Sequence, residues 1–285
     1  MNKLNYSMLL VGWCLWGGFI SPLKAAEAGL PAELAAGSVA ELGAQLESEP
    51  VAELGSQQQS VQAQLLLDTV KQQLQRVHWH HWQSDGNWAY TVETQLDNGN
   101  TEHKIQHTKQ RFDPSLPAAQ QWQLLEFDFA APTAKNLAEY RHRQQSVEQS
   151  SPHEEQQAAR SALQQLELVD LSTLQFSEQN GQQQLLLFRP KLPMFEQQVQ
   201  QLFSGVLSFD LQQQRVTSLY IELQQSFSPR LSFTIKQYRL HIRLEQIDGE
   251  LHMVAVDKHI VGSAFWLTDY DEKSSKVFSD FNRSD

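Results

Sequence analysis

Apolar and polar residues alternate along much of the chain, most regularly in its second half. A period of two is typical of strands with one buried face, because successive side chains of a strand point to opposite sides of the sheet. The clearest alternating sets are Leu207, Phe209 and Leu211; Leu219, Ile221 and Leu223; Leu231, Phe233 and Ile235; and Tyr238, Leu240, Ile242 and Leu244. Shorter segments of strand character lie at 88–94, 102–112, 122–129, 183–188, 254–256, 265–267 and 277–281.

Glycine turns separate several of these segments. Asn98-Gly99, Asn180-Gly181 and Asp248-Gly249 each predict a hairpin, because the tight turns between antiparallel strands favour residues that tolerate positive φ. The alternation slips between Ile235 and Tyr238, which predicts a bulge that bends the strand. Strands joined by such turns are antiparallel.

Apolar residues recur at helical spacing after Ser60, which can cap a helix that begins there. The apolar stripe comprises Val61, Leu65, Leu66, Leu67, Val70, Leu74 and Val77. Further helices are expected from Pro132-Thr133, from the capping box Ser151-Pro152-His153-Glu154, and within Pro193–Phe203.

These elements predict an α+β fold. Because the strands are apolar on one face and polar on the other, one face must be covered, and the helices are the available cover. We therefore expect a curved antiparallel β-meander, an open half-barrel, with helices packed on its concave side.

The N-terminus resembles an export signal. Lys3 precedes an uncharged run from Met8 to Ile20, which is short for a bilayer span but of the usual length for a signal-peptide core. Ala26-Glu27-Ala28 offers a cleavage site, so residues 1–28 are predicted to be a signal peptide and the protein to be periplasmic. An uncleaved N-terminal anchor is the alternative.

Residues 29–59 are predicted to be a flexible, low-complexity leader. They contain a short repeat, in which Val39–Gln45 returns as Val51–Gln57, and two copies are too few for a solenoid. A repeated partner-binding helix is the alternative. Residues 60–285 then form a single domain, and no second apolar run predicts a transmembrane helix in the mature chain.

Charge and cysteine content exclude several functions. The formal net charge is −11, which argues against a nucleic-acid partner. The one cysteine, Cys14, lies in the predicted signal peptide, so the mature chain would have no disulfide, zinc–thiolate site or catalytic thiol.

Histidines near residue 80 form the most conspicuous polar cluster. His78, His80 and His81, with His103 and His107, have the chemistry of metal ligands. Solvated histidines at a helix-to-strand junction are the expectation we adopt, and a metal-dependent enzyme or metal chaperone is the alternative.

Other polar clusters have ordinary explanations. Asp269, Asp271 and Glu272 lack the spacing of a calcium loop and are expected at a solvated hairpin tip. Asp210 and Glu222 are conceivable as a carboxylate pair on neighbouring strands. The aromatic residues Trp79, Trp82, Trp88 and Trp122 either line a hollow or fill the core. We therefore predict no catalytic, cofactor-binding or metal-binding residue, no cofactor, and no enzymatic activity.

The layout of the chain from residue 60 resembles the LolA/LolB family of periplasmic lipoprotein carriers and receptors. The similarity is greatest at Ile260–Leu267 and Val277–Phe281, which resemble the closing strands of uncharacterised proteobacterial periplasmic proteins of this shape. The resemblance implies an open half-barrel whose hydrophobic hollow, lidded by helices, holds acyl chains. It implies a non-enzymatic carrier for a lipid or lipoprotein acyl chain in envelope maintenance. An envelope scaffold that binds a protein partner and no small ligand is the alternative.

Overall fold

The computed structural model describes residues 51–77, 87–99, 105–149, 168–192, 195–230, 233–264 and 268–284. The predicted signal peptide, most of the leader and the helix expected from Ser151 lie outside these residues. Within them, no helix is long and apolar enough to cross a membrane.

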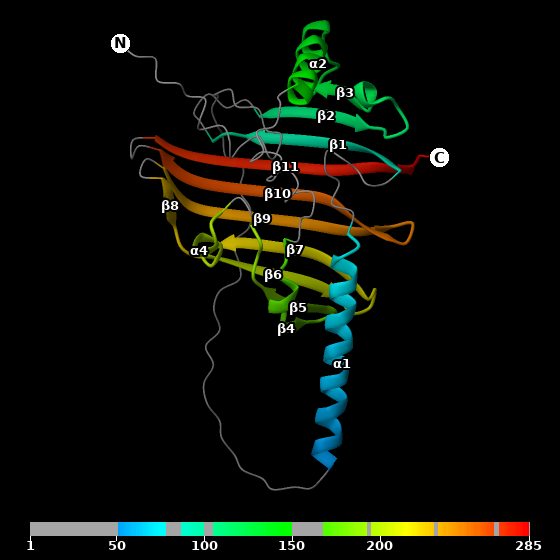
Figure 1. Cartoon of the computed structure of the whole chain (residues 1–285), viewed down its shortest axis with the longest axis vertical. Helices are drawn as coiled ribbons and strands as arrows, with labels where there is room; N and C mark the ends of the chain where they lie inside the picture. The colour runs from blue at the N-terminus through cyan, green and yellow to red at the C-terminus, as the bar shows by residue number, and fades with distance from the viewer. Residues whose placement is uncertain are drawn as a thin grey trace.

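The described residues form one large, twisted antiparallel sheet with few helices (Figure 1). Its strands are β1 (Trp88–Asp97), β2 (Gln106–Phe112), β3 (Trp122–Phe127), β4 (Gln175–Asn180), β5 (Gln183–Phe188), β6 (Phe203–Asp210), β7 (Arg215–Leu223), β8 (Phe227–Arg230), β9 (Phe233–Ile247), β10 (Glu250–Ala264) and β11 (Thr268–Arg283). The helices are α1 (Val51–Leu74), α2 (Ala134–Gln149) and the short α4 (Gln197–Gln200), with single 3₁₀ turns at Ala118–Gln120 and Leu171–Thr173.

Two meanders make up the sheet. The strand order is β3-β2-β1-β11-β10-β9-β7-β6-β5-β4, with β8 paired to β9 beside this path. The first strand therefore lies next to the last, where Val92 faces Phe278. The sheet is not closed, and β3 and β4 are its two edges, so the predicted open antiparallel meander is confirmed.

Three turn and bulge predictions are confirmed. Asn180 pairs with Gln183 across a two-residue turn that begins with Gly181 at φ +60°. Asp248 and Gly249 both have positive φ, at 49° and 84°, between β9 and β10. In β9 the pairing shifts where Ile235 faces Gly262 and Gln237 faces Val261, which leaves Lys236 in a bulge.

The tight hairpin predicted at Asn98-Gly99 is wrong. Leu96 pairs with Gln106, so β2 begins four residues after the expected Glu102 and the connection is longer than two residues. Gly99 has another role, because a Cβ there would lie 1.9 Å from the backbone oxygen of Asp271. The glycine permits close approach of the chain to β11 rather than a two-residue turn.

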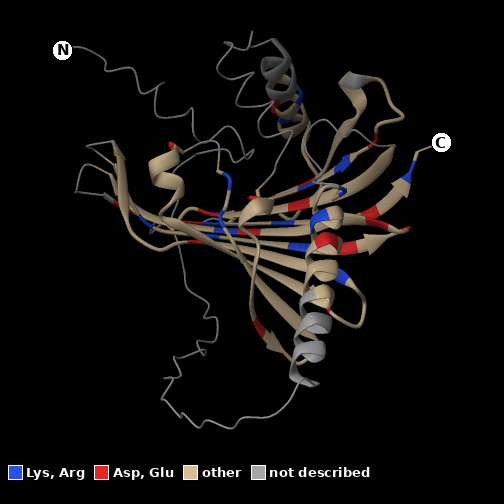
Figure 2. Ribbon diagram, turned by 60° about the horizontal axis from the view of Figure 1, so that its bottom comes forward, with Lys and Arg blue, Asp and Glu red and all other residues tan. Residues whose placement is uncertain are grey.

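The two faces of the sheet differ in chemistry. One face, the core face, carries a row of aliphatic residues that pair across four strands and are each at most 2% exposed: Leu207, Leu219, Ile242 and Val256. Burying each such side chain contributes roughly 1.5–3 kcal/mol. The opposite, outer face carries ion pairs such as Arg239–Glu222 at 2.8 Å and Lys236–Asp269 at 2.7 Å. Figure 2 shows acidic and basic residues scattered along the strands rather than gathered in one region.

Helix α1 packs on the core face against β7. Val70, Leu74 and Val77 are buried there, with Leu66 and Leu67 half-buried beside them. The helix begins at Val51, nine residues before the expected start at Ser60, and includes Gly55. A single glycine costs a helix only about 1 kcal/mol relative to alanine, so the glycine did not prevent helix formation.

The remaining helices lie at the margins of the sheet. α2 contacts the edge strand β3 and donates a hydrogen bond from Tyr140 Oη to Gln110 Oε1 at 3.1 Å. The predicted helix within Pro193–Phe203 is limited to Gln197–Gln200, because Phe203 already belongs to β6. The predicted strand Trp122–Phe129 ends at Phe127, since the chain turns at Asp128 and Phe129.

Gln73 fixes α1 to the turn between β6 and β7. Its Nε2 donates to the carbonyl of Gln214 at 2.7 Å, and its Oε1 accepts from the backbone N–H of fully buried Val216 at 2.8 Å. We expect Gln73→Ala to lower the free energy of unfolding by about 1–3 kcal/mol, because a buried N–H loses its partner. Chemical denaturation measures this change. Gln72→Ala, at an exposed position of the same helix, is the control and should leave stability nearly unchanged; equal stability of the two variants would contradict the role of Gln73.

Candidate functional site

The predicted histidine cluster is only partly described. His78, His80, His81 and His103 lie outside the described residues, as do Trp79 and Trp82. Trp88 is 3% exposed, and Trp122 packs against the core, so these two tryptophans fill the fold. Among the described residues, no three His, Cys, Asp or Glu side chains are grouped as metal ligands.

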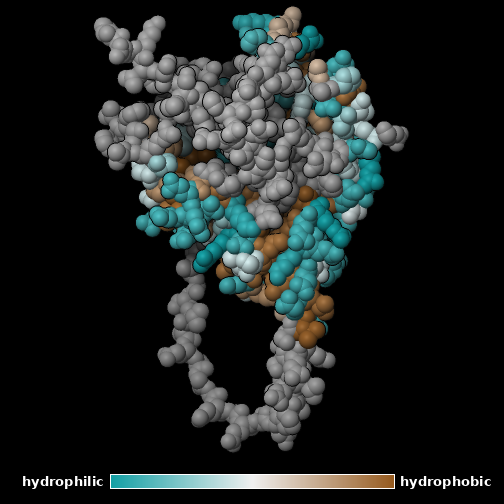
Figure 3. All heavy atoms as spheres, in the orientation of Figure 1, coloured by the Kyte–Doolittle hydropathy of each residue, from teal (hydrophilic) through white to brown (hydrophobic). Residues whose placement is uncertain are grey.

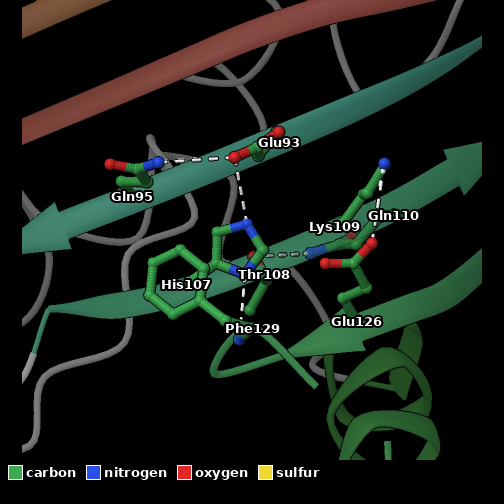
Figure 4. A network of polar contacts seen from close by, with 8 residues as sticks. All are labelled: Glu93, Gln95, His107, Thr108, Lys109, Gln110, Glu126 and Phe129. Carbon is green, nitrogen blue, oxygen red and sulfur yellow. Dashed lines mark hydrogen bonds and ion pairs between the residues drawn. The ribbon is translucent and has the colours of Figure 1, made fainter. Parts of the chain in front are cut away.

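His107 is buried, with 2% of its surface exposed, and both ring nitrogens have partners (Figure 4). The backbone N–H of Phe129 donates to Nδ1 at 3.2 Å, so Nδ1 carries no proton. The proton is therefore on Nε2, which lies 3.1 Å from Glu93 Oε1 and donates to it. The imidazole links β1, β2 and the turn after β3, and has no free nitrogen for a metal or a substrate.

The turn above His107 is held in an unfavourable conformation. Asp128 and Phe129 have φ of 50° and 61°, a left-handed conformation that costs roughly 1–2 kcal/mol for a residue with a side chain. The Phe129 ring stacks on His107 with centroids 4.0 Å apart, and the Asp128 N–H donates to the His107 carbonyl at 2.8 Å. These contacts offset the strain and give His107 a structural role.

The carboxylate pair considered at Asp210 and Glu222 does not form. Asp210 pairs with Arg215 at one end of β6, whereas Glu222 pairs with Ser204 at the other end. Asp210 is six positions after Ser204 along the strand, a distance of about 20 Å. The two carboxylates cannot act on one bond.

A serine, an aspartate and a histidine lie side by side on the outer face, but in the wrong order for a catalytic triad. Asp257 pairs with His241 on one side and with Ser275 on the other. Ser275 Oγ donates to Asp257 Oδ1 at 2.7 Å, so the carboxylate, not the imidazole, accepts from the hydroxyl. Burial lowers the pKa of His241. Activation of a serine nucleophile requires a hydrogen bond from its hydroxyl to the imidazole. In this arrangement Asp257 lies between Ser275 and His241, so that hydrogen bond cannot form.

The expected solvated tip at Asp269, Asp271 and Glu272 is wrong for Glu272. These residues belong to β11, so their side chains alternate between the two faces of the sheet. On the outer face Asp269 makes an ion pair with Lys236 at 2.7 Å, and Asp271 Oδ1 lies 2.7 Å from Nε2 of His259. Glu272 points to the core face and only 3% of it is exposed.

Glu272 belongs to a charged patch on the core face of β10 and β11. Its Oε1 lies 2.9 Å from Lys258 Nζ, and the two side chains are only 4% and 14% exposed. Ser274 faces Lys258 across the strand pair, and Lys276 follows on the same side of β11. We call Lys258, Glu272, Ser274 and Lys276 the lysine patch.

The lysine patch interrupts an otherwise apolar face. The aliphatic row described above runs from Leu207 to Val256, and its next member across the sheet is Lys276. The neighbouring row passes from Ile221 through Leu240 to Lys258. The core face therefore changes from apolar to charged between β9 and β11.

Burial alters the chemistry of the patch. Desolvation, with a further contribution from the charge of Lys258, lowers the pKa of Lys276 from 10.5 to about 8. Within the described residues, Glu272 Oε2 has no hydrogen-bond partner, although its atom is shielded from solvent. A buried ion pair with an open acceptor and a second ammonium group nearby is weak evidence for a stabilising role and is typical of functional sites.

Aromatic side chains lie next to the patch. Phe195, Phe203, Phe227 and Tyr238 form an aromatic cluster, with ring centroids 5.3 Å apart for Phe195–Phe203 and 5.5 Å apart for Phe203–Tyr238. Phe195 and Phe227 remain partly exposed. Half-buried Ile260 connects the cluster to the patch, because it pairs with Tyr238 on β9 and with Glu272 on β11.

Sequence reasoning missed the lysine patch, although the signal was present. Lys258 is in phase with Val256 and Ile260, and Lys276 is in phase with Phe278. A charged residue in the apolar phase of a strand marks an inward-facing charge. The short strands expected at 254–256 and 277–281 are instead parts of two long strands, so Lys258 and Lys276, just outside the expected segments, were not assigned to a face.

Comparison with known proteins found no matching family model, curated protein or solved structure. The resemblance to lipoprotein carriers therefore stays a prediction.

Lys276 should destabilise the protein at neutral pH. Its pKa is lower in the folded than in the unfolded chain, so the unfolded chain binds more protons between about pH 8 and pH 10.5 and stability rises through that window. We expect Lys276→Met to be more stable than the wild type by about 2 kcal/mol at pH 7, allowing for the solvent that still reaches the side chain. The difference should shrink as the pH approaches 10.5.

Denaturant titrations at pH 7 and pH 10 measure this difference. Lys273→Met is the control, because Lys273 is an exposed residue of the same strand. A Lys276→Met variant that is less stable than the wild type at pH 7 would contradict the prediction.

Proposed function

We propose that the protein is a non-enzymatic, periplasmic binding or carrier protein for an apolar ligand, such as a lipid or a lipoprotein acyl chain. The observation that carries the proposal is the partly exposed aromatic cluster beside a charged patch on the core face of an open sheet. Large aromatic side chains supply apolar contact area, and ligand sites combine such a lining with a few polar groups. The run from Met8 to Ile20 supports export through a signal peptide.

The arrangement of α1 fits a cover over the ligand region. We infer that the core face is the concave one and that α1 lies over it as a lid. In support, α1 joins the core through a stripe of a few aliphatic residues and through Gln73. A lid held by few contacts can move without unfolding the sheet.

An envelope scaffold that binds a protein partner is the second candidate. One observation favours it: Val61 and Leu65 of α1 are 59% and 62% exposed. Figure 3 shows this hydrophobic surface where α1 leaves the body of the sheet. Apolar residues on the free part of a helix are common contacts for a partner protein.

Lipid extraction tests the carrier proposal. Protein purified from the periplasm of an expressing Gram-negative cell should release a lipid into organic solvent, detected by mass spectrometry. After lipid removal it should take up a fluorescent fatty-chain probe. Neither bound lipid nor probe uptake would reject a carrier and favour the scaffold.

A substitution next to the aromatic cluster makes the test specific. We expect Ile260→Asn to weaken probe binding about tenfold, since the loss of one apolar contact surface costs about 1–2 kcal/mol. Val261→Asn is the matched control, because Val261 is the next residue of β10 and lies on the outer face opposite Asp271. Equal binding by both variants would place the ligand away from this region.

A further inference from the structure

Two Asn-Gly pairs occur in the chain, and the structure places them in different surroundings. Asn98-Gly99 follows β1 and is half-buried, whereas Asn180-Gly181 lies at the end of β4 and is exposed. The dipeptide has a chemistry of its own. Because glycine has no Cβ, its backbone nitrogen is open to attack on the side-chain amide carbon of the asparagine before it.

The structure leaves Asn180-Gly181 open to this reaction. Gly181 begins a two-residue turn with φ +60°, and a Cβ there would meet nothing within 4 Å. Within the described part of the chain, neither the Asn180 side chain nor the Gly181 N–H has a hydrogen-bond partner. Every residue of β4 is exposed, and β5 is its one neighbour among the described strands. A strand end with so few buried contacts opens at low free-energy cost, so the Asn180 amide carbon can reach the Gly181 nitrogen.

The structure holds Asn98-Gly99 in place. The Gly99 N–H donates to Asp97 Oδ1 at 3.0 Å, so this nitrogen is already bound to a carboxylate. A Cβ at Gly99 would lie 1.9 Å from the backbone oxygen of Asp271, which shows how closely the chain packs on β11. β11 is an inner strand, hydrogen-bonded to β1 and β10. Rotation of the Gly99 nitrogen toward Asn98 would break the hydrogen bond and lift the chain from the sheet.

We propose that Asn180 is a site of spontaneous deamidation and that the fold protects Asn98 from the same reaction. The Gly181 nitrogen loses its proton to hydroxide and bonds to the Asn180 amide carbon. The bond from that carbon to Nδ2 breaks, ammonia leaves, and a cyclic imide remains. Water then opens the imide at either carbonyl and gives aspartate or isoaspartate. The net reaction consumes one water and releases one ammonia, and it is independent of the proposed function.

The product changes the exposed end of the β4–β5 hairpin. It adds a carboxylate to a chain whose formal net charge is already −11. Isoaspartate also adds a methylene group to the backbone at residue 180, which pairs with Gln183 where the hairpin closes. Because the ammonia is lost to solvent, the modified fraction increases with the age of the molecule.

Peptide mapping by mass spectrometry tests the proposal. The full chain is incubated in mildly alkaline buffer made with heavy-oxygen water, so that only asparagines that react during the incubation acquire the label. We expect the label to accumulate at Asn180 at least about tenfold faster than at Asn98, because release of Gly99 breaks a hydrogen bond to a carboxylate. Isoaspartate should form at residue 180, since direct hydrolysis of the side-chain amide gives aspartate alone.

The same chain unfolded in urea is the control. Both Asn-Gly pairs then lack tertiary contacts and should react at similar rates, so the difference in the folded chain belongs to the fold and not to the dipeptide. In the folded chain, Asp97→Ala should raise the rate at Asn98 several-fold, because the Gly99 N–H loses its acceptor. The rate at Asn180 should stay unchanged in this variant.

Three results would overturn the proposal. The first is equal labelling of the two asparagines in the folded chain, or faster labelling of Asn98. The second is labelled aspartate at residue 180 without isoaspartate. The third is a folded chain that acquires no label at Asn180 while the urea-unfolded chain is labelled at both residues, since the fold would then protect Asn180 as well.

Discussion

The pairing of β1 with β11 is the interaction on which the rest of the structure depends. It joins the meander β1–β3 to the meander β4–β11, and its partners are separated by most of the length of the chain. Tyr90 on β1 contacts Phe278 and Phe281 on β11 with ring centroids 5.8 and 6.1 Å apart, so the aromatic core spans the junction. Without this pairing the protein would have two smaller sheets, with the edges of β1 and β11 exposed. A contact between such distant residues forms late, because the loop entropy must be lost before the contact stabilises the fold.

The pairing of β1 with β11 also determines where the core face changes from apolar to polar. Lys276 lies between Val256 on β10 and Thr94 on β1, at the boundary between the apolar rows and the polar positions of the first meander. Neither meander alone would surround these charges on both sides. The lysine patch is thus a product of the long-range pairing, and the interior around it has a lower effective dielectric constant than water, which strengthens each charge–charge interaction.

Local sequence signals predicted most of the sheet, because its strands alternate regularly and its turns use residues suited to positive φ. Asp248-Gly249 and Asn180-Gly181 were predicted correctly since the turn chemistry is contained in the turn itself. The role of Gly99 was predicted wrongly, because a glycine is required there by the close approach of Asp271, which is distant in the sequence. The start of the first helix was predicted nine residues too late, because it was assigned from the capping residue Ser60 and from the apolar stripe that follows it. The lysine patch could be predicted only once the full lengths of β10 and β11 were known, because the alternation along each strand then places its lysines on the core face. The order in which the two meanders join is not encoded in any local pattern.

The Lys258–Glu272 pair also opposes slippage of β10 against β11. A shift of one residue moves every side chain of a strand to the other face of the sheet. Such a shift would separate Lys258 from Glu272, which now lie 2.9 Å apart, and would leave one of the two charges buried alone. Because an unpaired buried charge is strongly destabilising, the pair holds the two long strands in a single register.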